Sequence, residues 1–154
     1  MAIDPIFWQA VPALFHSAPA DRAELILAEG LLPWDQGPGT RFVDELEWEF
    51  HEPRPGHVYL STSSDPVEPD HVVFAVDPRQ LDPQRVNPDE DWVSEGSGRF
   101  LMGRMFGDGD GTLGEMAEAF GLGDDPQHSR ASLEEFGAVA YRGAVPPSAV
   151  RLAA

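Results

Sequence analysis

Glycine and proline interrupt this chain so often that no regular element can extend far. The sequence contains fifteen Gly and fifteen Pro among 154 residues, and they recur along its whole length. Because both residues break helices and strands and favour turns, we expect many short elements and no long helix. A hydrophobic fraction of 42% still suffices for a globular core. The length, and the lack of a linker-like tract, predict one domain over residues 1–154.

The chain is strongly acidic. Its 27 Asp and Glu residues face only ten basic residues, all of them Arg, and the formal net charge is −17. A field of this sign repels phosphate backbones, which disfavours nonspecific nucleic-acid binding. It is compatible with a small anionic ligand in a local Arg pocket, or with a basic protein partner.

Cysteine is absent, which excludes disulfides, thiolate nucleophiles and Cys-based zinc sites. The N-terminus lacks the basic residues of a secretory leader, and no later apolar run is long enough to span a membrane. We therefore expect a cytoplasmic protein that does not insert into membranes.

The clearest local signal is a helix near the N-terminus, predicted over residues 22–29. Asp21 and Glu24 have the spacing of a capping box, and Gly30 stands where a helix C-cap is expected. Strands are predicted over residues 13–16, 58–61, 71–76 and 138–142, with a further short one within 78–91. A second helix is predicted over 113–120, whereas the Pro-rich segment 63–70 predicts a turn. This order of elements indicates an α+β fold with mostly antiparallel strands.

Common chemical motifs are missing from the sequence. The segment "GDGDGTLGE" (107–115) resembles a calcium loop, but Phe106 and Ala117 occupy the positions of its two outer ligands. The five His residues do not have the spacing of a helical metal site, so no metal is expected. No P-loop, dinucleotide fingerprint or nucleophile elbow is present.

Two short clusters carry polar groups suited to a ligand. In "LFHS", His16 stands at the end of an apolar strand, where a core or capping histidine is the alternative. In "VYLSTS", Val58 and Leu60 face one side of the strand, while Tyr59, Ser61 and Ser63 face the other. That second face could stack on a planar ligand and hydrogen-bond to it, or could simply be a solvent-facing edge.

Taken in order, these segments resemble the ADP-ribosyltransferase superfamily. The resemblance covers "LFHSAPADRAELILAEGLLPW", "VYLSTS", "VVFAVD" and the closing "VAYRGAVPPSAV", the last of these being similar to the RNA 2′-phosphotransferase-like and DNA-ADP-ribosyltransferase-toxin-like branches. It implies an ADP-ribosyltransferase-like domain with a mostly antiparallel split sheet and few short helices. The segment 63–70 departs from the family pattern, because a helix is usual there.

The resemblance also implies roles for individual residues. His16, with Ser17 beside it, would bind the ribose of NAD, and the Tyr59 ring would pack on the nicotinamide with Ser61 and Thr62 supporting the site. The third family motif is a Glu near a late strand, and its nearest matches are Glu134 and Glu135. A fixed carboxylate in a dry pocket stabilises the positive charge that develops on the sugar when the nicotinamide bond breaks. A solvated helix end is the alternative interpretation of "LEEFG".

The resemblance implies an NAD-dependent ADP-ribosyltransferase, in the manner of a bacterial toxin or modifying enzyme, with NAD as a substrate. The acceptor is unidentified, and the net charge of −17 favours a protein or a small molecule over nucleic acid. Two alternatives stay open: a catalytically silent acidic protein of the same fold that binds a basic partner, and an RNA 2′-phosphotransferase-like enzyme.

Overall fold

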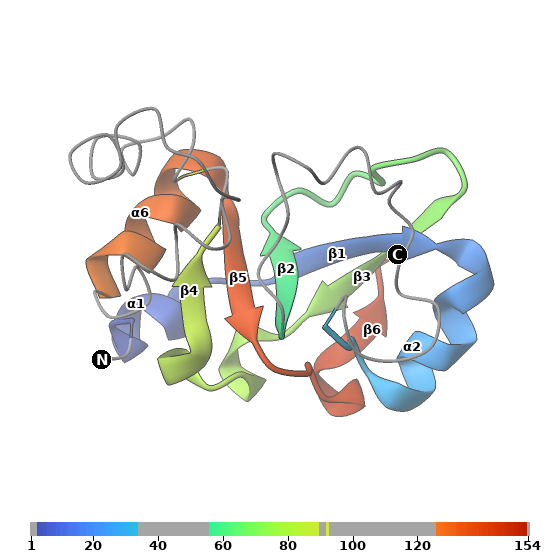
Figure 1. Cartoon of the computed structure of the whole chain (residues 1–154), viewed down its shortest axis with the longest axis horizontal. Helices are drawn as coiled ribbons and strands as arrows, with labels where there is room; N and C mark the ends of the chain where they lie inside the picture. The colour runs from blue at the N-terminus through green and yellow to red at the C-terminus, as the bar shows by residue number, and fades with distance from the viewer. Residues whose placement is uncertain (1–2, 34–55, 90–91, 93–125, 154) are drawn as a thin grey trace, which may run out of the picture.

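The computed structural model describes residues 3–33, 56–89, 92 and 126–153, and these residues build one six-stranded sheet flanked by short helices (Figure 1). The strands are β1 (Leu14–Pro19), β2 (His57–Ser61), β3 (His71–Val76), β4 (Val86–Pro88), β5 (Ala138–Arg142) and β6 (Val150–Leu152). Their order across the sheet is β4-β5-β2-β1-β3-β6, and every neighbouring pair is antiparallel. The antiparallel α+β arrangement expected from the sequence is confirmed.

The described helices are short, as the Gly and Pro content predicts. They are α1 (Pro5–Ala10), α2 (Ala23–Glu29) and α6 (Pro126–Phe136), with the single 3-10 turns η1 (Ala20–Arg22), η2 (Pro78–Gln80), η3 (Pro83–Arg85) and η5 (Pro147–Ala149). Helix α6 packs on β4 and β5, whereas α2 lies against β6 and η5. The two helices therefore stand at opposite ends of the long axis of the molecule (Figure 1).

Most of the predicted strands are present with small shifts of their ends. The strand expected over 71–76 coincides with β3, that over 138–142 coincides with β5, and the short strand expected within 78–91 is β4. Helix α1 and the last strand, β6, were not predicted, and α6 was expected only as the helix end that is the alternative interpretation of "LEEFG". The second predicted helix (113–120) and the calcium-like segment 107–115 lie outside the described residues.

The predicted capping box is wrong. Asp21 lies inside the 3-10 turn η1, so it is not placed to cap the α-helix that follows. Arg22 occupies the N-cap of α2 and makes no capping hydrogen bond through its side chain. The predicted C-terminus is correct: Gly30 is the C-cap, and its N–H donates to the Ile26 carbonyl at 2.7 Å.

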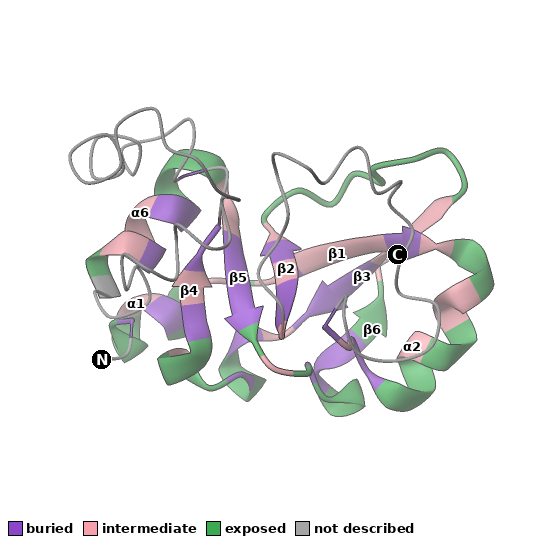
Figure 2. Ribbon diagram, in the orientation of Figure 1, coloured by how far each residue is buried: buried purple, intermediate pink, exposed green. Residues whose placement is uncertain are grey.

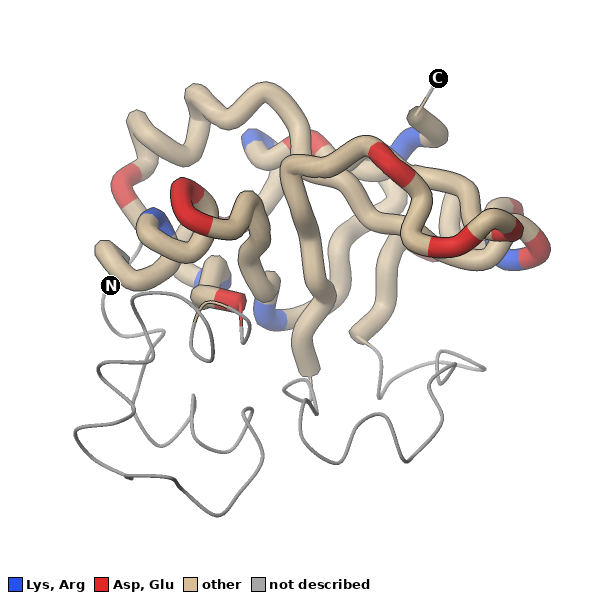
Figure 3. Tube along the Cα trace, turned by 90° about the horizontal axis from the view of Figure 1, so that it is seen from above, with Lys and Arg blue, Asp and Glu red and all other residues tan. Residues whose placement is uncertain are grey.

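The core lies on and between the strands, whose sequences contain no Asp, Glu or Lys. Leu14, Phe74, Val76 and Val139 are completely buried. Figure 2 shows β5 mostly buried and α2 largely exposed, and Figure 3 shows the described carboxylates on helices and loops. The acidic charge is therefore carried outside the sheet.

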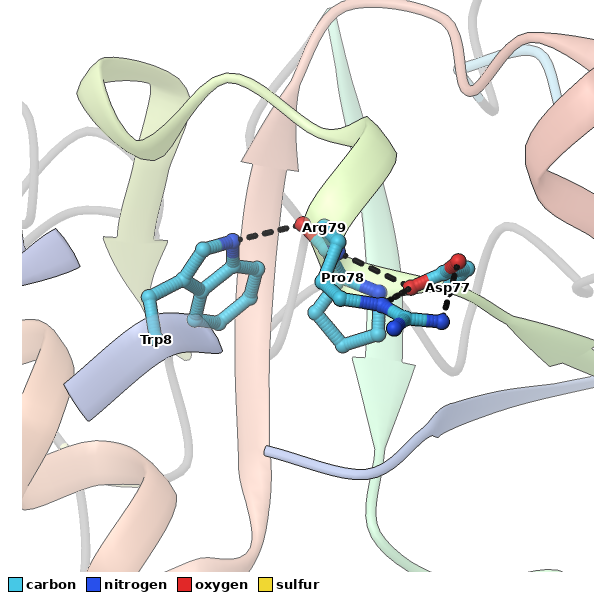
Figure 4. A network of polar contacts seen from close by, with 4 residues as sticks. All are labelled: Trp8, Asp77, Pro78 and Arg79. Atoms are coloured by element: carbon cyan, nitrogen blue, oxygen red, sulfur yellow. Dashed lines mark hydrogen bonds and ion pairs between the residues drawn. The ribbon is translucent and has the colours of Figure 1, made fainter. Parts of the chain in front are cut away.

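Helix α1 is fixed to the rest of the fold by its tryptophan. The buried indole of Trp8 donates from Nε1 to the Pro78 carbonyl at 2.8 Å (Figure 4). Next to Pro78, the Arg79 side chain donates from Nε to the Asp77 carboxylate at 3.0 Å, which lowers the pKa of Asp77. These contacts attach the N-terminal residues to the turn that follows β3.

The two central strands separate soon after they meet. Strand β1 pairs with β3 along six residues and β2 pairs with β5 along five, but β1 and β2 are in register only at Phe15 and Ser61. Beyond that pair the strands diverge, and backbone groups of β2 that would have bonded to β1 need other partners. The sheet is thus split between β1 and β2.

Candidate functional site

A cavity of about 190 Å³ opens beside the split between β1 and β2. Its lining comes from four parts of the chain: the second half of β1, helix α2 with the residues after it, the first half of β2, and the start of β3. The lining residues are His16, Ser17, Ala18, Pro19, Arg22, Leu25, Ile26, Glu29, Gly30, Leu31, Leu32, His57, Val58, Tyr59 and His71. Three predicted residues, His16, Ser17 and Tyr59, therefore share one cavity. Folding brings His16 and Tyr59 together although they are 43 positions apart in the sequence.

His16 replaces a missing strand-to-strand contact. Its Nδ1 lies 2.9 Å from the carbonyl oxygen of Tyr59, across the split. Because a carbonyl only accepts, Nδ1 carries the proton, and Nε2 of the neutral ring is an acceptor. Burial lowers the pKa of His16, the neighbouring His71 lowers it further, and the bond to Tyr59 opposes both effects. The imidazole is therefore neutral at neutral pH and can accept a hydrogen bond from a ligand hydroxyl.

The Ser17 hydroxyl forms hydrogen bonds with two other residues of the fold. Its Oγ accepts from the Val67 N–H at 2.9 Å and lies 2.8 Å from Nδ1 of His71. The simplest assignment has the hydroxyl donating to Nδ1, which leaves the His71 proton on Nε2. Ser17 thereby positions His71 as a donor at the cavity and holds the turn that precedes β3.

The first half of β2 supplies a second histidine and the aromatic ring. His57 is 8% exposed, and its Nε2 accepts from the Asn87 amide nitrogen at 2.9 Å. Tyr59 is half-buried, and Val58 between them is buried, as the predicted alternation of β2 requires. The backbone of β2 is held firmly on its other side, where Tyr59 pairs with Ala140 of β5.

Helix α2 presents one face to the cavity. The lining residues Arg22, Leu25, Ile26 and Glu29 are spaced i, i+3, i+4 and i+7, which is the stripe of a single helix face. Both ends of the stripe are charged, and its middle is apolar. Gly30 then turns the chain with φ of +84°, so that Leu31 can bridge to Val145.

Ser61 and Thr62 do not line the cavity. Ser61 Oγ accepts from the Ser63 N–H at 3.2 Å, which closes the turn after β2. The Thr62 N–H donates to the Gly137 carbonyl at 2.6 Å. These two residues therefore connect β2 to the loop between α6 and β5, and the predicted support of a ligand is not seen in their contacts.

Glu134 and Glu135 lie on α6, away from the cavity. Glu134 is exposed, and its Oε1 accepts from Nε of Arg130 at 3.0 Å. Glu135 accepts from Nε1 of the buried Trp92. Because α6 packs on β4 and β5 at the far end of the molecule from α2, the geometry does not place either carboxylate beside His16 and Tyr59 (Figure 1).

Sequence reasoning missed four polar residues of the site: Arg22, Glu29, His57 and His71. For Arg22 and Glu29 a signal existed, because their seven-residue spacing on a predicted helix puts them on one face with Leu25 and Ile26. For the two histidines there was none. They reach the cavity because β2 and β3 begin beside it, which only the strand order decides.

Comparisons of the chain with protein-family profiles, with curated proteins and with solved structures gave no match. Among the described residues, no three His, Asp or Glu side chains gather as a metal ion would require. No helix in the described part of the chain is long and apolar enough to cross a membrane. The site is therefore interpreted from its own geometry.

The lining combines an aromatic ring, imidazoles, apolar side chains and a charged rim. An apolar cavity of roughly 150 Å³ holds a benzene molecule, so about 190 Å³ accommodates one planar ring. The imidazoles supply hydrogen bonds inside the cavity, and Arg22 and Glu29 supply charge at its edge. Such a site suits a small heteroaromatic ligand with hydroxyl and charged substituents.

Proposed function

We propose that the cavity binds NAD by its nicotinamide riboside end and that the chain is an ADP-ribosyltransferase of the superfamily that its sequence resembles. The observation that carries the proposal is the meeting of His16 and Tyr59 at one cavity. The resemblance assigns these residues to two separate motifs, and they lie on neighbouring strands at the split of the sheet. The cavity volume of about 190 Å³ fits a nicotinamide ring.

In this proposal each residue has a defined task. Nε2 of neutral His16 accepts a hydrogen bond from a ribose hydroxyl, and the Tyr59 ring packs on the nicotinamide. The bond between C1′ of the ribose and the nicotinamide nitrogen breaks, and the nitrogen keeps the electron pair, so the pyridinium leaves as neutral nicotinamide. The acceptor then bonds to C1′ and loses a proton to a base or to solvent.

A catalytic carboxylate is the part of this chemistry with the least structural support. The predicted Glu134 and Glu135 lie elsewhere, and Glu29, which does line the cavity, is exposed to solvent. A carboxylate stabilises a developing cation best where water is excluded. This observation favours a second candidate function, in which the chain binds NAD or a related nucleotide without cleaving it.

Calorimetric titration with NAD tests the proposal. We expect saturable binding to the unmodified chain, and a loss of about tenfold or more in affinity for Tyr59→Ala, since stacking on a ring contributes roughly 1–3 kcal/mol. Tyr59→Phe should retain most of the affinity, because it keeps the ring. Ser63→Ala is the matched control: Ser63 belongs to the same polar segment but is exposed and lies outside the cavity.

Nicotinamide release separates the two candidates. An enzyme releases free nicotinamide from NAD at a rate that falls when Tyr59 or His16 is replaced, whereas a binding protein gives the same calorimetric titration without release. No heat and no thermal shift at saturating NAD would reject both. Circular dichroism of each variant shows whether a loss of binding reflects the site or a loss of the fold.

A further inference from the structure

The charges at the rim of the cavity are arranged along α2 with opposite signs at its two ends. Arg22 stands at the N-cap of the helix and Glu29 is its last residue. With a rise of about 1.5 Å per residue, seven residues separate their backbones by roughly 10 Å. Leu25 and Ile26 fill the distance between them. A ligand lying along this face therefore meets a cation at one end and an anion at the other.

The basic end has a second donor. His71 lines the same cavity, and its contact with Ser17 through Nδ1 leaves Nε2 as the protonated nitrogen. Arg22 and His71 together suit a phosphate group. At the other end, Glu29 is followed directly by Gly30, Leu31 and Leu32, which also line the cavity and bring no positive charge. No ion pair joins Glu29 to another residue in the described part of the chain.

We propose that Arg22 and Glu29 orient the dinucleotide along α2, and that Glu29 makes the site select NAD against NADP. This inference rests on NAD as the ligand of the cavity. With the nicotinamide in the cavity and the pyrophosphate at Arg22 and His71, the adenosine ribose extends along the rim toward Glu29. A carboxylate there accepts hydrogen bonds from the ribose hydroxyls but repels the additional phosphate of NADP.

The solvent exposure of Glu29 favours a role in ligand selection over a role in catalysis. Glu29 is an exposed side chain, so water competes for its charge and weakens any stabilisation of a ribosyl cation. Water also weakens the repulsion between Glu29 and a phosphate, but the phosphate carries two charges, so the repulsion is still sufficient at low salt to separate NAD from NADP. It weakens as salt is added, because screening shortens the reach of exposed charges. Glu29 is thus a specificity-determining residue and not a catalytic one.

Parallel titrations with NAD and NADP test the inference. For the unmodified chain at low salt we expect NADP to bind about tenfold more weakly than NAD or worse, from like-charge repulsion at near contact. Glu29→Gln should bring the two affinities to within about threefold of each other by improving NADP binding. Arg22→Gln should weaken both ligands similarly, because both contain the pyrophosphate.

Glu24→Gln is the matched control, since it makes the same charge change on the same helix at an exposed position outside the cavity. It should leave the ratio of affinities unchanged. If NAD and NADP bind the unmodified chain equally, or if Glu29→Gln leaves their ratio as it was, the inference is wrong and the proposed function stands. If neither dinucleotide binds, both are wrong.

Discussion

The two ends of this molecule both contain a helix that ends in glycine, yet they use polar side chains in different ways. At the α2 end, the polar groups of β1, β2 and β3 line a cavity, and His16 replaces strand pairing at the split by bonding to the Tyr59 carbonyl. At the α6 end, the polar groups bond to one another: Trp92 to Glu135, and Arg130 to Glu134. Carboxylates beside a late strand are therefore not sufficient to make a site, whereas a gap in a sheet provides both space and backbone groups that side chains can reach, as His16 reaches the Tyr59 carbonyl.

The largest effect is expected from Gly30, the glycine that ends α2. A Cβ at Gly30 would lie 2.0 Å from the carbonyl oxygen of Val145, which is backbone and cannot turn aside, and the φ of +84° is strained for alanine. We expect Gly30→Ala to lower the free energy of unfolding by about 3 kcal/mol or more. Urea denaturation followed by circular dichroism measures it.

Gly137→Ala is the counterpart at the α6 end. The nearest atoms to its Cβ would belong to the Thr62 side chain, which can shift more readily than backbone, so most of the cost is that of the φ of +65°, about 1–2 kcal/mol. If the two variants lose the same free energy of unfolding, the backbone at Val145 shifts as easily as the Thr62 side chain. In that case the wall of the cavity is less rigid than its contacts indicate.

The second prediction concerns Glu135. Glu135→Ala removes the acceptor of the Trp92 indole, which is only 2% exposed. An unpaired buried donor costs roughly 1–3 kcal/mol, and thermal unfolding should record a loss in that range. Glu135→Gln keeps an acceptor and should lose less. NAD affinity should be unchanged in both variants, and a lost nicotinamide-release activity in a stable Glu135→Gln protein would instead support the catalytic role predicted from the sequence.

The third prediction is a pH dependence from His16. Its pKa is lowered in the folded chain, so below about pH 6.5, the ordinary value, the unfolded chain binds more protons than the folded one. Stability is therefore complete above that pH, and it declines as the pH falls until the folded-state pKa is reached. A single titrating group changes the free energy of unfolding by at most about 1.4 kcal/mol per pH unit.

We would measure denaturant midpoints between pH 7.5 and pH 5 for the unmodified chain and for the His16→Asn variant. The difference between the two isolates the contribution of His16 from those of the other histidines. A direct titration of the imidazole by NMR gives the same quantity if the variant folds poorly. A His16 that titrates at or above its ordinary value would show that the ring is more hydrated than its position indicates.

The smallest effect is expected at Glu134. Its ion pair with Arg130 is exposed and spaced i, i+4, so Glu134→Ala should cost only about 0.3–0.5 kcal/mol. Repeating the unfolding measurement in high salt should remove most of this difference. A loss comparable to that of Glu135→Ala would mean that the outer face of α6 contributes more to stability than its exposure predicts.

The fold was predictable where alternation and turn residues are strong. Strands β2, β3 and β5 follow from their apolar residues and flanking breakers, and Gly30 from helix capping. The starts of helices α1 and α6 were missed because each begins at a proline, which fits both a helix start and a turn. Of the seven polar residues that line the cavity, the local motifs and the resemblance predicted three: His16, Ser17 and Tyr59. His57 and His71 required the strand order, and the spacing of Arg22 and Glu29 was not used.

The single point of pairing between β1 and β2 divides the sheet into two three-stranded halves, β4-β5-β2 and β1-β3-β6. Each half is well bonded internally, so a small rotation of one against the other is the softest deformation that the sheet allows. That rotation would widen or narrow the cavity. A ligand that contacts residues of both halves acts as a reversible cross-link between them, so occupancy of the site and rigidity of the whole sheet are coupled.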